Sequence, residues 1–402
     1  MQNEIELLLP ADDCPNPEVS LVVPALNEQI SIGRFVEWCR EGLLKAGVQG
    51  EILIVDSSTD NTPAIAVEKG ARVLRTPRRG LGRAYIDALG YVRGKYVIMG
   101  DCDCTYDFRE IGPFIEDFRK GSEFIMGSRF KGYIETGAMP PLHRYFGTPI
   151  TTSILNFMYG CHFSDIHCGM RGLTLDSYRR LDLKAQKWEY ASEMIIKAVH
   201  IGLKTSEVPI RFLKGMQGRT SHLNRHWYIP WLAGWQNLRA FFIFKPDFFL
   251  RKPGYFFSFL GFFLVFALGF GPISMGKLVL SLHSQIFGLF LLALGTSFLE
   301  IDALATLFLG FQHKRIARIK RLYNLDKTAP ISLLLVLIGL VFVFYSAADW
   351  IGADFRLFTV SHGFVAGLGF ILLGVQLFLK SLTIALFSLE ARPQDDHALV
   401  RQ

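Results

Sequence analysis

The first half of the chain alternates between short apolar runs and stretches with helical spacing. Between residues 19 and 221, apolar runs of strand length are separated by segments whose apolar residues recur every three or four positions. The predicted strands are residues 20–24, 51–56, 72–74 and 96–99, and the predicted helices are residues 35–46, 62–69 and 82–92. Because strands that alternate with helices form mostly parallel sheets, this half is expected to be an α/β domain.

The second half contains four long apolar stretches. They are residues 254–274, 285–310, 331–348 and 362–389. Each is long enough to cross about 30 Å of hydrocarbon, so four transmembrane helices are expected, with a buried helical core domain as the alternative. A composition of 50% hydrophobic and 20% charged residues also fits a soluble domain joined to a membrane domain better than one uniform globule.

Charges in the connecting loops predict the orientation of the chain. The loop between the second and third predicted spans carries six basic residues: Lys314, Arg315, Arg318, Lys320, Arg321 and Lys327. The two other loops carry only Lys277 and Arg356. The positive-inside rule therefore places the rich loop, the N-terminal domain and the C-terminal tail in the cytoplasm. Six cysteines without a Cys-x-x-Cys pair predict reduced thiols, and an acidic N-terminus without a basic region predicts no secretory signal.

Three tryptophans lie between the two halves. Trp227, Trp231 and Trp235 recur every four residues among basic residues. This spacing predicts an interfacial amphipathic segment on an anionic leaflet, with a helix packed on the soluble domain as the alternative. The expected organisation is an N-terminal extension (1–18), the α/β domain (19–224), the interfacial segment (225–252), the transmembrane domain (253–389) and a cytoplasmic tail (390–402).

An Asp-x-Asp motif follows the fourth predicted strand. Asp101 and Asp103 stand one residue apart directly after residues 96–99. Two such carboxylates can hold one divalent cation that bridges a diphosphate. A lone Asp-x-Asp occurs in many loops, but ligands bind at the carboxyl ends of parallel strands, and this position favours a metal site. Asp107 is expected instead to cap the helix that follows.

Carboxylates also follow the first two predicted strands. Glu28 comes shortly after residues 20–24, and Asp56 ends residues 51–56. We expect both to accept hydrogen bonds from a ligand, whereas Asp60 and Thr62 are expected to cap a helix. Residues 78–83, Arg-Arg-Gly-Leu-Gly-Arg, open a helix whose N-terminus favours phosphate, although they do not complete a G-x-G-x-x-G motif.

Later motifs narrow the prediction. They are GSRF at residues 127–130, AMPPLHR at 138–144, DIHCGMR at 165–171 and EYASEM at 189–194. In this order the motifs resemble glycosyltransferase family 2, which has a nucleotide-sugar-binding GT-A fold, and within it the polyprenyl-phosphate hexosyltransferases, such as dolichol-phosphate mannose and glucose synthases. The resemblance covers roughly residues 19–240, and the four spans resemble those of some members. It implies inverting transfer of a hexose from UDP-glucose or GDP-mannose to a polyprenyl monophosphate.

The resemblance also implies roles on the donor side. Asp101 and Asp103 would hold Mg²⁺ or Mn²⁺ on the donor diphosphate, and Pro24, Glu28 and Asp56 would hold the nucleoside. The expected partners are a nucleotide sugar, a polyprenyl phosphate and the membrane. No nucleic-acid partner is expected, and homo-oligomerisation stays open.

On the acceptor side, Arg129 and Arg144 match the two arginines that clamp the lipid phosphate. A forked guanidinium suits a phosphate, and the alternative for either residue is a surface ion pair. Asp165 and Glu193 stand where relatives have acidic residues lining the sugar pocket; the alternative is support of Arg171 or of a helix end. The expected catalytic residues are Asp103, Arg129, Arg144 and Glu193.

Two further predictions concern charged residues. Residues 218–223, GRTSHL, stand where many relatives read Gly-x-Ser-Lys-Leu, so Arg219 becomes the candidate cation at the diphosphate, with a solvated basic loop as the alternative. Within the spans, Asp302 or Glu300 and Lys380 fall at similar depths. We predict an interhelical ion pair between them.

Two other functions compete with this one. A membrane polysaccharide or glycolipid synthase of the same family would share the domain, but polysaccharide synthases usually carry Gln-x-x-Arg-Trp, and the nearest stretch here, residues 224–227, reads NRHW. A non-catalytic membrane protein that binds a nucleotide sugar is disfavoured because the Asp-x-Asp motif and both arginines are intact.

Overall fold

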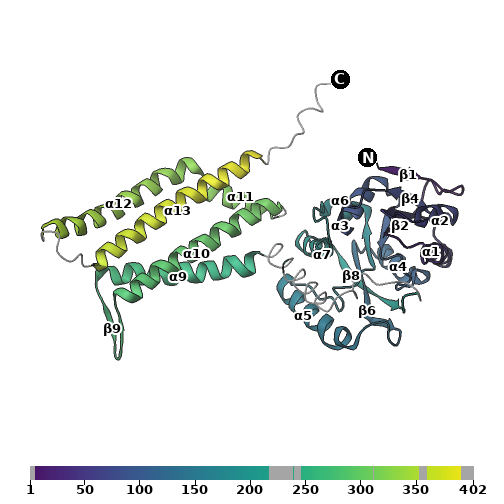
Figure 1. Ribbon diagram of the computed structural model, residues 1–402, viewed down its shortest axis with the longest axis horizontal. Coiled ribbons are helices and arrows are strands. Elements are labelled where there is room, and N and C mark those ends of the chain that lie inside the picture. Colours follow the sequence, from purple (N-terminus) through teal and green to yellow (C-terminus); the bar gives the residue numbers. More distant parts are fainter. Residues whose placement is uncertain (1–4, 217–238, 240–245, 311, 353–359, 391–402) are drawn as a thin grey trace, which may run out of the picture. The chain divides into compact units, whose positions relative to one another are not determined.

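The computed structural model describes residues 5–216, 239, 246–310, 312–352 and 360–390. The chain divides into two compact units, Met1–Phe244 and Lys245–Gln402, and each buries hydrophobic side chains of its own (Figure 1). The boundary falls inside the predicted interfacial segment 225–252. Most of that segment, including its three tryptophans, lies outside the described residues, as does the tail from residue 391.

Unit 1 is built on an eight-stranded sheet with the order β1-β4-β3-β2-β5-β7-β6-β8. The strands are β1 (Glu6–Leu8), β2 (Val19–Ala25), β3 (Gly50–Asp56), β4 (Arg72–Arg75), β5 (Tyr96–Met99), β6 (Phe124–Ile134), β7 (Arg171–Thr174) and β8 (Thr205–Phe212). Neighbours β4, β3, β2 and β5 are parallel, as are β6 and β8, whereas β1 and β7 run antiparallel to their neighbours. The predicted mostly parallel α/β sheet is confirmed.

The predicted N-terminal extension contributes a strand to this sheet. Strand β1 pairs antiparallel with β4, with Glu6 opposite Arg75 and Leu8 opposite Val73. No strand was predicted here, because three residues are too few to show a periodic pattern. The pairing covers the outer edge of β4, which would otherwise present unpaired backbone groups.

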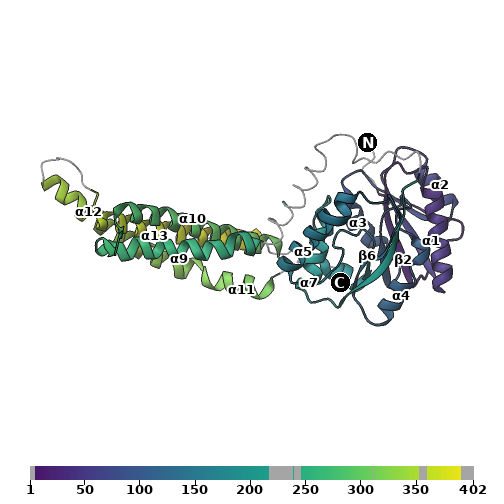
Figure 2. The ribbon, with the colours of Figure 1, turned by 90° about the horizontal axis from the view of Figure 1, so that it is seen from below.

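Helices cover both faces of the sheet (Figure 2). They are α1 (Ile32–Ala46), α2 (Thr62–Glu68), α3 (Leu81–Ala88), α4 (Gly112–Arg119), α5 (Thr148–Tyr159), α6 (Leu175–Leu181) and α7 (Tyr190–His200). Helices α1, α2 and α4 lie on one face, and α3 and α7 lie on the other. In α1, Phe35, Cys39 and Leu43 recur every four residues and are buried, and the helix ends at Gly47, whose φ of 63° is left-handed.

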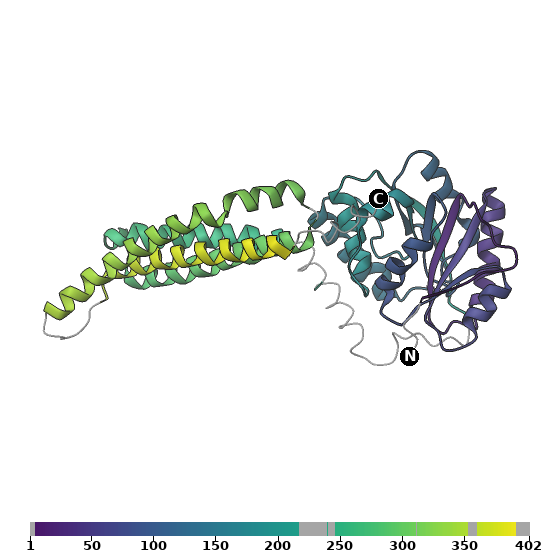
Figure 3. The same cartoon turned by 90° about the horizontal axis from the view of Figure 1, so that it is seen from above.

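Unit 2 consists mainly of four long helices that lie side by side (Figure 3). They are α9 (Lys252–Ala267), α10 (Leu282–Leu309), α12 (Leu325–Gly352) and α13 (His362–Glu390). Four candidate membrane spans coincide with them, Asp247–Phe270, Leu282–Leu309, Leu325–Gly352 and His362–Ser388, so the prediction of four spans is confirmed. A hairpin of β9 (Ile273–Met275) and β10 (Leu278–Leu280) joins α9 to α10, and α11 (His313–Leu322) joins α10 to α12.

Small residues allow these helices to pack closely. A Cβ added at Gly261 of α9 would overlap the backbone nitrogen of Leu292 in α10, and one at Gly295 would overlap Ser258. Such close backbone approach is the usual basis of helix association in membranes. Gln285 is fully buried and donates hydrogen bonds to the carbonyls of Val265 and His362, each at 2.9 Å, which ties α10 to both neighbours.

The predicted ion pair of Lys380 with Asp302 or Glu300 is wrong, since neither pair forms among the described residues. Asp302 of α10 instead forms an ion pair with Arg315 of α11. Lys380 of α13 lies over the ring of Tyr323, with its Nζ 4.1 Å from the ring centroid. The prediction considered charges within the spans alone, whereas α11 packs back against the bundle and supplies the partner.

Candidate active site

Polar residues gather where four parallel strands end. Ala25 of β2 lies opposite Asp56 of β3, which in turn lies opposite Arg75 of β4. Val22 of β2 lies opposite Met99, the last residue of β5. The residues that follow these positions, among them Glu28 and the Asp-x-Asp motif, therefore emerge along one edge of the sheet, where ligands of open α/β sheets bind.

The loops after β2 and β3 hold each other in place. Asn27 has a φ of 56°, its backbone nitrogen donates to Ser58 Oγ at 2.7 Å, and its Oδ1 accepts from the backbone nitrogen of Thr59 at 2.9 Å. The backbone nitrogen of Glu28 donates to Thr62 Oγ1 at 2.9 Å, and its Oε2 accepts from Ser31 Oγ at 2.8 Å. These bonds fix the Glu28 carboxylate near the sheet edge before any ligand arrives.

Asp107 caps a helix, as predicted, whereas the N-cap of α2 is Asn61 rather than Asp60 or Thr62. Asp60 Oδ1 accepts from the backbone nitrogen of Thr62 at 3.0 Å, just where α2 begins. The Asp107 side chain accepts from the backbone nitrogen of Arg109 and caps the short helix η2 (Phe108–Glu110). Neither carboxylate is therefore needed to explain ligand binding.

Asp56 is the buried carboxylate of this edge. Its side chain is fully buried, and neither oxygen accepts a hydrogen bond of good geometry from a described residue. Arg75 Nη1 lies 3.1 Å from Oδ2. Burial raises the pKa of Asp56, while nearby Ser58 and the Arg75 guanidinium oppose that rise. A buried carboxylate with unused acceptor capacity is suited to receive hydrogen bonds from a ligand.

The Asp-x-Asp motif lies in the loop after β5. Asp103 Oδ1 accepts from the backbone nitrogen of Thr105 at 3.0 Å and from its Oγ1 at 2.5 Å, which orients the carboxylate. A Cβ added at Gly169 would come within 3.0 Å of Asp101 Oδ2, so the glycine leaves space beside this carboxylate. Both side chains supply oxygen ligands, which Mg²⁺ and Mn²⁺ prefer.

The donor set limits the kind of metal that fits. Across the described ranges, no group of three or more His, Cys, Asp or Glu side chains is placed to hold a metal ion. Two carboxylates fit a hard cation that takes its remaining ligands from phosphate oxygens and water, as Mg²⁺ commonly does. The residues present therefore fit a cation that binds together with a phosphorylated substrate.

Arg129 and Asp165 form a buried forked ion pair. Arg129 Nε lies 2.6 Å from Asp165 Oδ2, Nη2 lies 2.8 Å from Oδ1, and the Arg129 backbone nitrogen donates to Oδ2 at 3.1 Å. Burial alone would lower the pKa of Arg129, but the hydrogen bonds to Asp165 raise it well above its usual range. Asp165 thus holds Arg129 rather than Arg171, which donates to the backbone carbonyls of Ile166, Cys168 and Ala191.

Tyr106 lies near both the Asp-x-Asp motif and this ion pair. Its hydroxyl accepts from the backbone nitrogen of Gly169 at 2.8 Å. Burial raises the pKa of Tyr106, with a further rise from Asp101 and an opposing effect from Arg129. Asp101 and Tyr106 both lie beside Gly169, and Tyr106 and Arg129 both lie against the ring of Phe212, so the carboxylate and the guanidinium are in one neighbourhood. Nearby, His167 Nε2 lies 2.8 Å from Thr151 Oγ1, and burial lowers its pKa to about 4.

Glu193 fixes a loop rather than facing an open space. It is 2% exposed, its Oε2 accepts from the backbone nitrogens of Lys184 at 3.0 Å and Ala185 at 2.8 Å, and its Oε1 lies 2.8 Å from Lys197 Nζ. The loop lies against the start of α3, where the backbone nitrogen of Arg83 donates to the Gln186 carbonyl at 2.9 Å. Glu193 thereby positions one wall of a basic pocket.

That pocket has a volume of about 350 Å³ and is lined by Arg78, Arg79, Gly80, Leu81, Lys187 and Trp188. Gly80 has a φ of 120°, and a Cβ there would overlap the carbonyl oxygen of Gln186. Three cations and an exposed indole beside the first turn of α3 suit a phosphorylated ligand. Residues 78–81 of the segment 78–83, which was predicted to favour phosphate, therefore line a pocket that the sequence alone does not reveal.

Arg144 lies beside an exposed apolar stripe. It belongs to the short helix η3 (His143–Gly147), which continues into α5. Leu142, Phe146, Ile150 and Ile154 recur every four residues and are 69%, 60%, 54% and 47% exposed. An exposed apolar surface of this kind marks contact with a partner or a membrane. This stripe was not predicted, although the four-residue spacing of its apolar residues is visible in the sequence.

Comparisons with known proteins follow the same division into two units. The pattern of glycosyl transferase family 2 matches residues 20–182, and that of the glycosyltransferase family 2 C-terminal transmembrane region matches residues 303–388. Over 381 residues, 94% of this chain and 90% of the relative, the chain is 33% identical to a low-salt glycan biosynthesis hexosyltransferase of Haloferax volcanii. The chain belongs to glycosyltransferase family 2.

Two further similarities are more partial. This chain is 29% identical over 202 residues to a dolichyl-phosphate hexose transferase of Haloferax volcanii, and the match covers 48% of this chain and 82% of the relative. A solved structure of glucosyl-3-phosphoglycerate synthase from Mycobacterium tuberculosis with Mn²⁺ and UDP has 19% identity and a TM-score of 0.45, covering 57% of this chain and 80% of that chain. The chain is an integral membrane hexosyltransferase with a GT-A fold.

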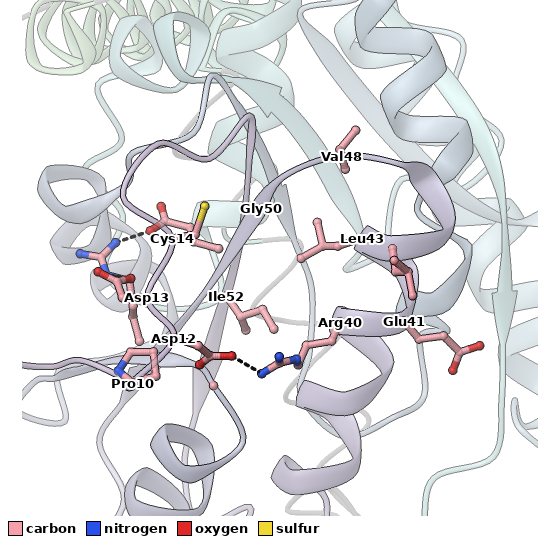
Figure 4. A pocket seen from close by; sticks show the side chains of 14 residues that line it. Pro10, Asp12, Asp13, Cys14, Arg40, Glu41, Leu43, Val48, Gly50 and Ile52 are labelled. Carbon is pink, nitrogen blue, oxygen red and sulfur yellow. Dashed lines mark hydrogen bonds and ion pairs between the residues drawn. The ribbon is translucent and has the colours of Figure 1, made fainter.

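A second pocket of this glycosyltransferase lies at the other end of the strands. It has a volume of about 510 Å³ and is lined by residues such as Gly50 and Arg72, which begin β3 and β4 (Figure 4). An ion pair between Asp12 and Arg40 at 2.9 Å closes one side. None of the predicted site residues lines it, so it is not part of the candidate active site.

The structure brings most of the predicted site together. Pro24 and Asp56 lie in the last two positions of β2 and β3, Glu28, Asp101 and Asp103 follow neighbouring strands, and Arg129 and Asp165 pair near Tyr106. Arg144 and Glu193 belong to separate helical segments, and Arg219 with His222 lies outside the described residues. Sequence reasoning missed Tyr106 and Glu207; the latter accepts from the backbone nitrogen of Ser164 at 2.6 Å and carries no motif that would single it out.

Proposed function

We propose that this enzyme transfers a hexose from UDP-glucose or GDP-mannose, with inversion, to the phosphate of a polyprenyl monophosphate. The observation that carries the proposal is the exposed apolar stripe of η3 and α5 with Arg144 in its midst, on a domain that is joined to membrane spans. An apolar face with a guanidinium matches a substrate that has a hydrocarbon tail and an anionic head. The dolichyl-phosphate hexose transferase among its relatives supports the same acceptor class.

On the donor side, Glu28 and Asp56 would accept hydrogen bonds from the nucleoside, beside Pro24 at the end of β2. Asp101 and Asp103 would hold Mg²⁺ or Mn²⁺, whose chemistry is to neutralise charge on the donor diphosphate and its leaving group. The basic pocket of Arg78, Arg79 and Lys187 is a second place where phosphate charge would be offset.

On the acceptor side, Arg144 and Arg129 would clamp the lipid phosphate. Arg129 uses Nε and Nη2 for Asp165, while its Nη1 donates to no described residue, so donors remain for a phosphate oxygen. A lipid monophosphate is already ionised near neutral pH, so it needs no strong general base. The demand on the site is electrostatic, because two anions must approach each other.

The proposed orientation places unit 1 and the C-terminus in the cytoplasm. Helix α11, between the second and third spans, contains five lysines and arginines and no acidic residue. The hairpin between the first and second spans carries Lys277 alone. This asymmetry supports α11 on the cytoplasmic side, and the four spans found among the described residues would then put unit 1 and the end of α13 on that side as well.

A donor and acceptor screen tests the proposal. Purified enzyme is incubated with UDP-glucose or GDP-mannose, undecaprenyl or dolichyl phosphate, and Mg²⁺ or Mn²⁺, with Asp103→Ala as the matched variant. We expect metal-dependent product with the wild type, almost none with the variant, and a product that mild acid cleaves, as a glycosyl phosphate requires. An acid-stable glycoside would indicate a polysaccharide or glycolipid synthase, and release of no nucleotide with any donor would favour a non-catalytic protein.

A further inference from the structure

Helix α11 connects two membrane spans at one end of the bundle (Figure 2). Helix α10 ends at Leu309 and α12 begins at Leu325, so α11 lies at the level where the spans leave the hydrocarbon. Of its ten residues, His313–Leu322, five are lysine or arginine and none is acidic. A helix with this composition and position lies at the height of lipid headgroups.

One face of α11 is fixed to the bundle. Arg315 pairs with Asp302 of α10, and Ile319, only 7% exposed, packs with Ala303 of α10 and Ile384 of α13. One turn further, Tyr323 lies beneath Lys380 of α13. The contacts recur every four residues, so they belong to one stripe along the helix and set its rotation.

A different face carries three of the four remaining charges of α11. Lys314, Arg318 and Arg321 are spaced by four and three residues, so they form a second stripe. All three are exposed, and none forms an ion pair with a described residue. Because Asp302 holds Arg315 on the inner face, the rotation of the helix keeps these three cations together on the outer one.

We propose that Lys314, Arg318 and Arg321 form a binding surface for the phosphate headgroups of anionic lipids in the surrounding leaflet. The charges are of one sign, they lie next to spans, and the Asp302–Arg315 pair prevents the helix from turning them away. Each lysine or arginine near an anionic leaflet contributes about 1 kcal/mol, or about fivefold in affinity. The surface is independent of the catalytic proposal and uses none of its residues.

Native mass spectrometry of the full chain in detergent tests this surface, with phosphatidylglycerol, phosphatidylcholine and undecaprenyl phosphate as probes. The Lys314→Gln variant is compared with Lys277→Gln, an exposed lysine in the hairpin at the other end of the bundle. We expect Lys314→Gln to weaken phosphatidylglycerol binding about fivefold, and the combined change of Lys314, Arg318 and Arg321 to glutamine to weaken it by more than tenfold. Phosphatidylcholine binding and the Lys277→Gln variant should stay at the wild-type level.

The position of the lost charge and the charge of the headgroup decide the result. Equal effects of Lys314→Gln and Lys277→Gln, or wild-type phosphatidylglycerol binding in the triple variant, would overturn the proposal. So would equal losses for both lipids, since the surface would then not distinguish headgroup charge. Loss of undecaprenyl phosphate binding alone would reassign the stripe to the acceptor. An unchanged melting temperature confirms that the variants fold, as expected for exposed side chains.

Discussion

The buried pair of Arg129 and Asp165 gives the sharpest test of the site's construction. The side chains are 10% and 0% exposed, and three hydrogen bonds join them. Removing one partner of a buried pair leaves an uncompensated charge and typically costs about 3–5 kcal/mol. Asp165→Asn keeps the shape of the side chain but replaces one carboxylate oxygen with an NH₂ group, so that a hydrogen-bond donor faces the donors of Arg129. We expect it, and Arg129→Met, to destabilise unit 1 by at least about 3 kcal/mol each.

The double variant distinguishes pairing from simple packing. Asp165→Asn combined with Arg129→Met removes both charges, so its loss of stability should be smaller than the sum of the single losses by about 2 kcal/mol or more. Pulse proteolysis of the full chain across a urea series measures these free energies. Lys120→Met, which removes an exposed ion pair with Asp117, is the control and should change little. Strictly additive losses, or single variants within about 1 kcal/mol of wild type, would refute the reasoning.

Three further predictions concern chemistry, pH and the membrane helices. Arg144→Ala should raise the KM for the lipid phosphate more than the KM for the nucleotide sugar. Initial rates measured with each substrate varied in turn give both constants. A larger rise in the KM for the nucleotide sugar would assign Arg144 to the donor. Burial lowers the pKa of His167 to about 4, so below about pH 6.5 the unfolded chain binds a proton at this residue that the folded chain does not. The free energy of unfolding should therefore fall as the pH is lowered from about 6.5 to 4. His167→Gln should flatten this part of a plot of unfolding free energy against pH. Gly261→Ala should lower the melting temperature, because its Cβ would overlap the backbone of α10. Gly352→Ala is the control and should not lower it, because a Cβ at Gly352 would meet no atom within 4 Å. Equal shifts in the two variants would argue against close packing of α9 on α10.

The edge of the sheet was predictable because it depends on local patterns. Alternating strands and helices place Glu28, Asp56 and Asp101 after strands, and parallel strands end along one edge whatever their order. The same reasoning succeeds for the spans, since hydropathy over about 20 residues needs no tertiary information. The cap residue Asp107 also follows from its neighbours in sequence.

Contacts between distant residues were not predictable from these patterns. Arg129 and Asp165 are 36 positions apart, and no spacing rule links a strand residue to a loop that follows a later helix. Glu193 carries a motif resemblance, yet its partners are backbone nitrogens of a loop that has no motif of its own. Asp302 was assigned the wrong partner because the connecting helix packs back onto the bundle, which hydropathy does not reveal.

The Arg129–Asp165 pair suits the proposed reaction, in which two anions must be held together. Fully exposed arginines would be satisfied by water, and an unpaired buried arginine would be costly, but Asp165 holds Arg129 in a buried, oriented state without using all of its donors. In the proposed reaction an incoming lipid phosphate therefore meets a guanidinium that is already desolvated and fixed, so little reorganisation is left for the encounter.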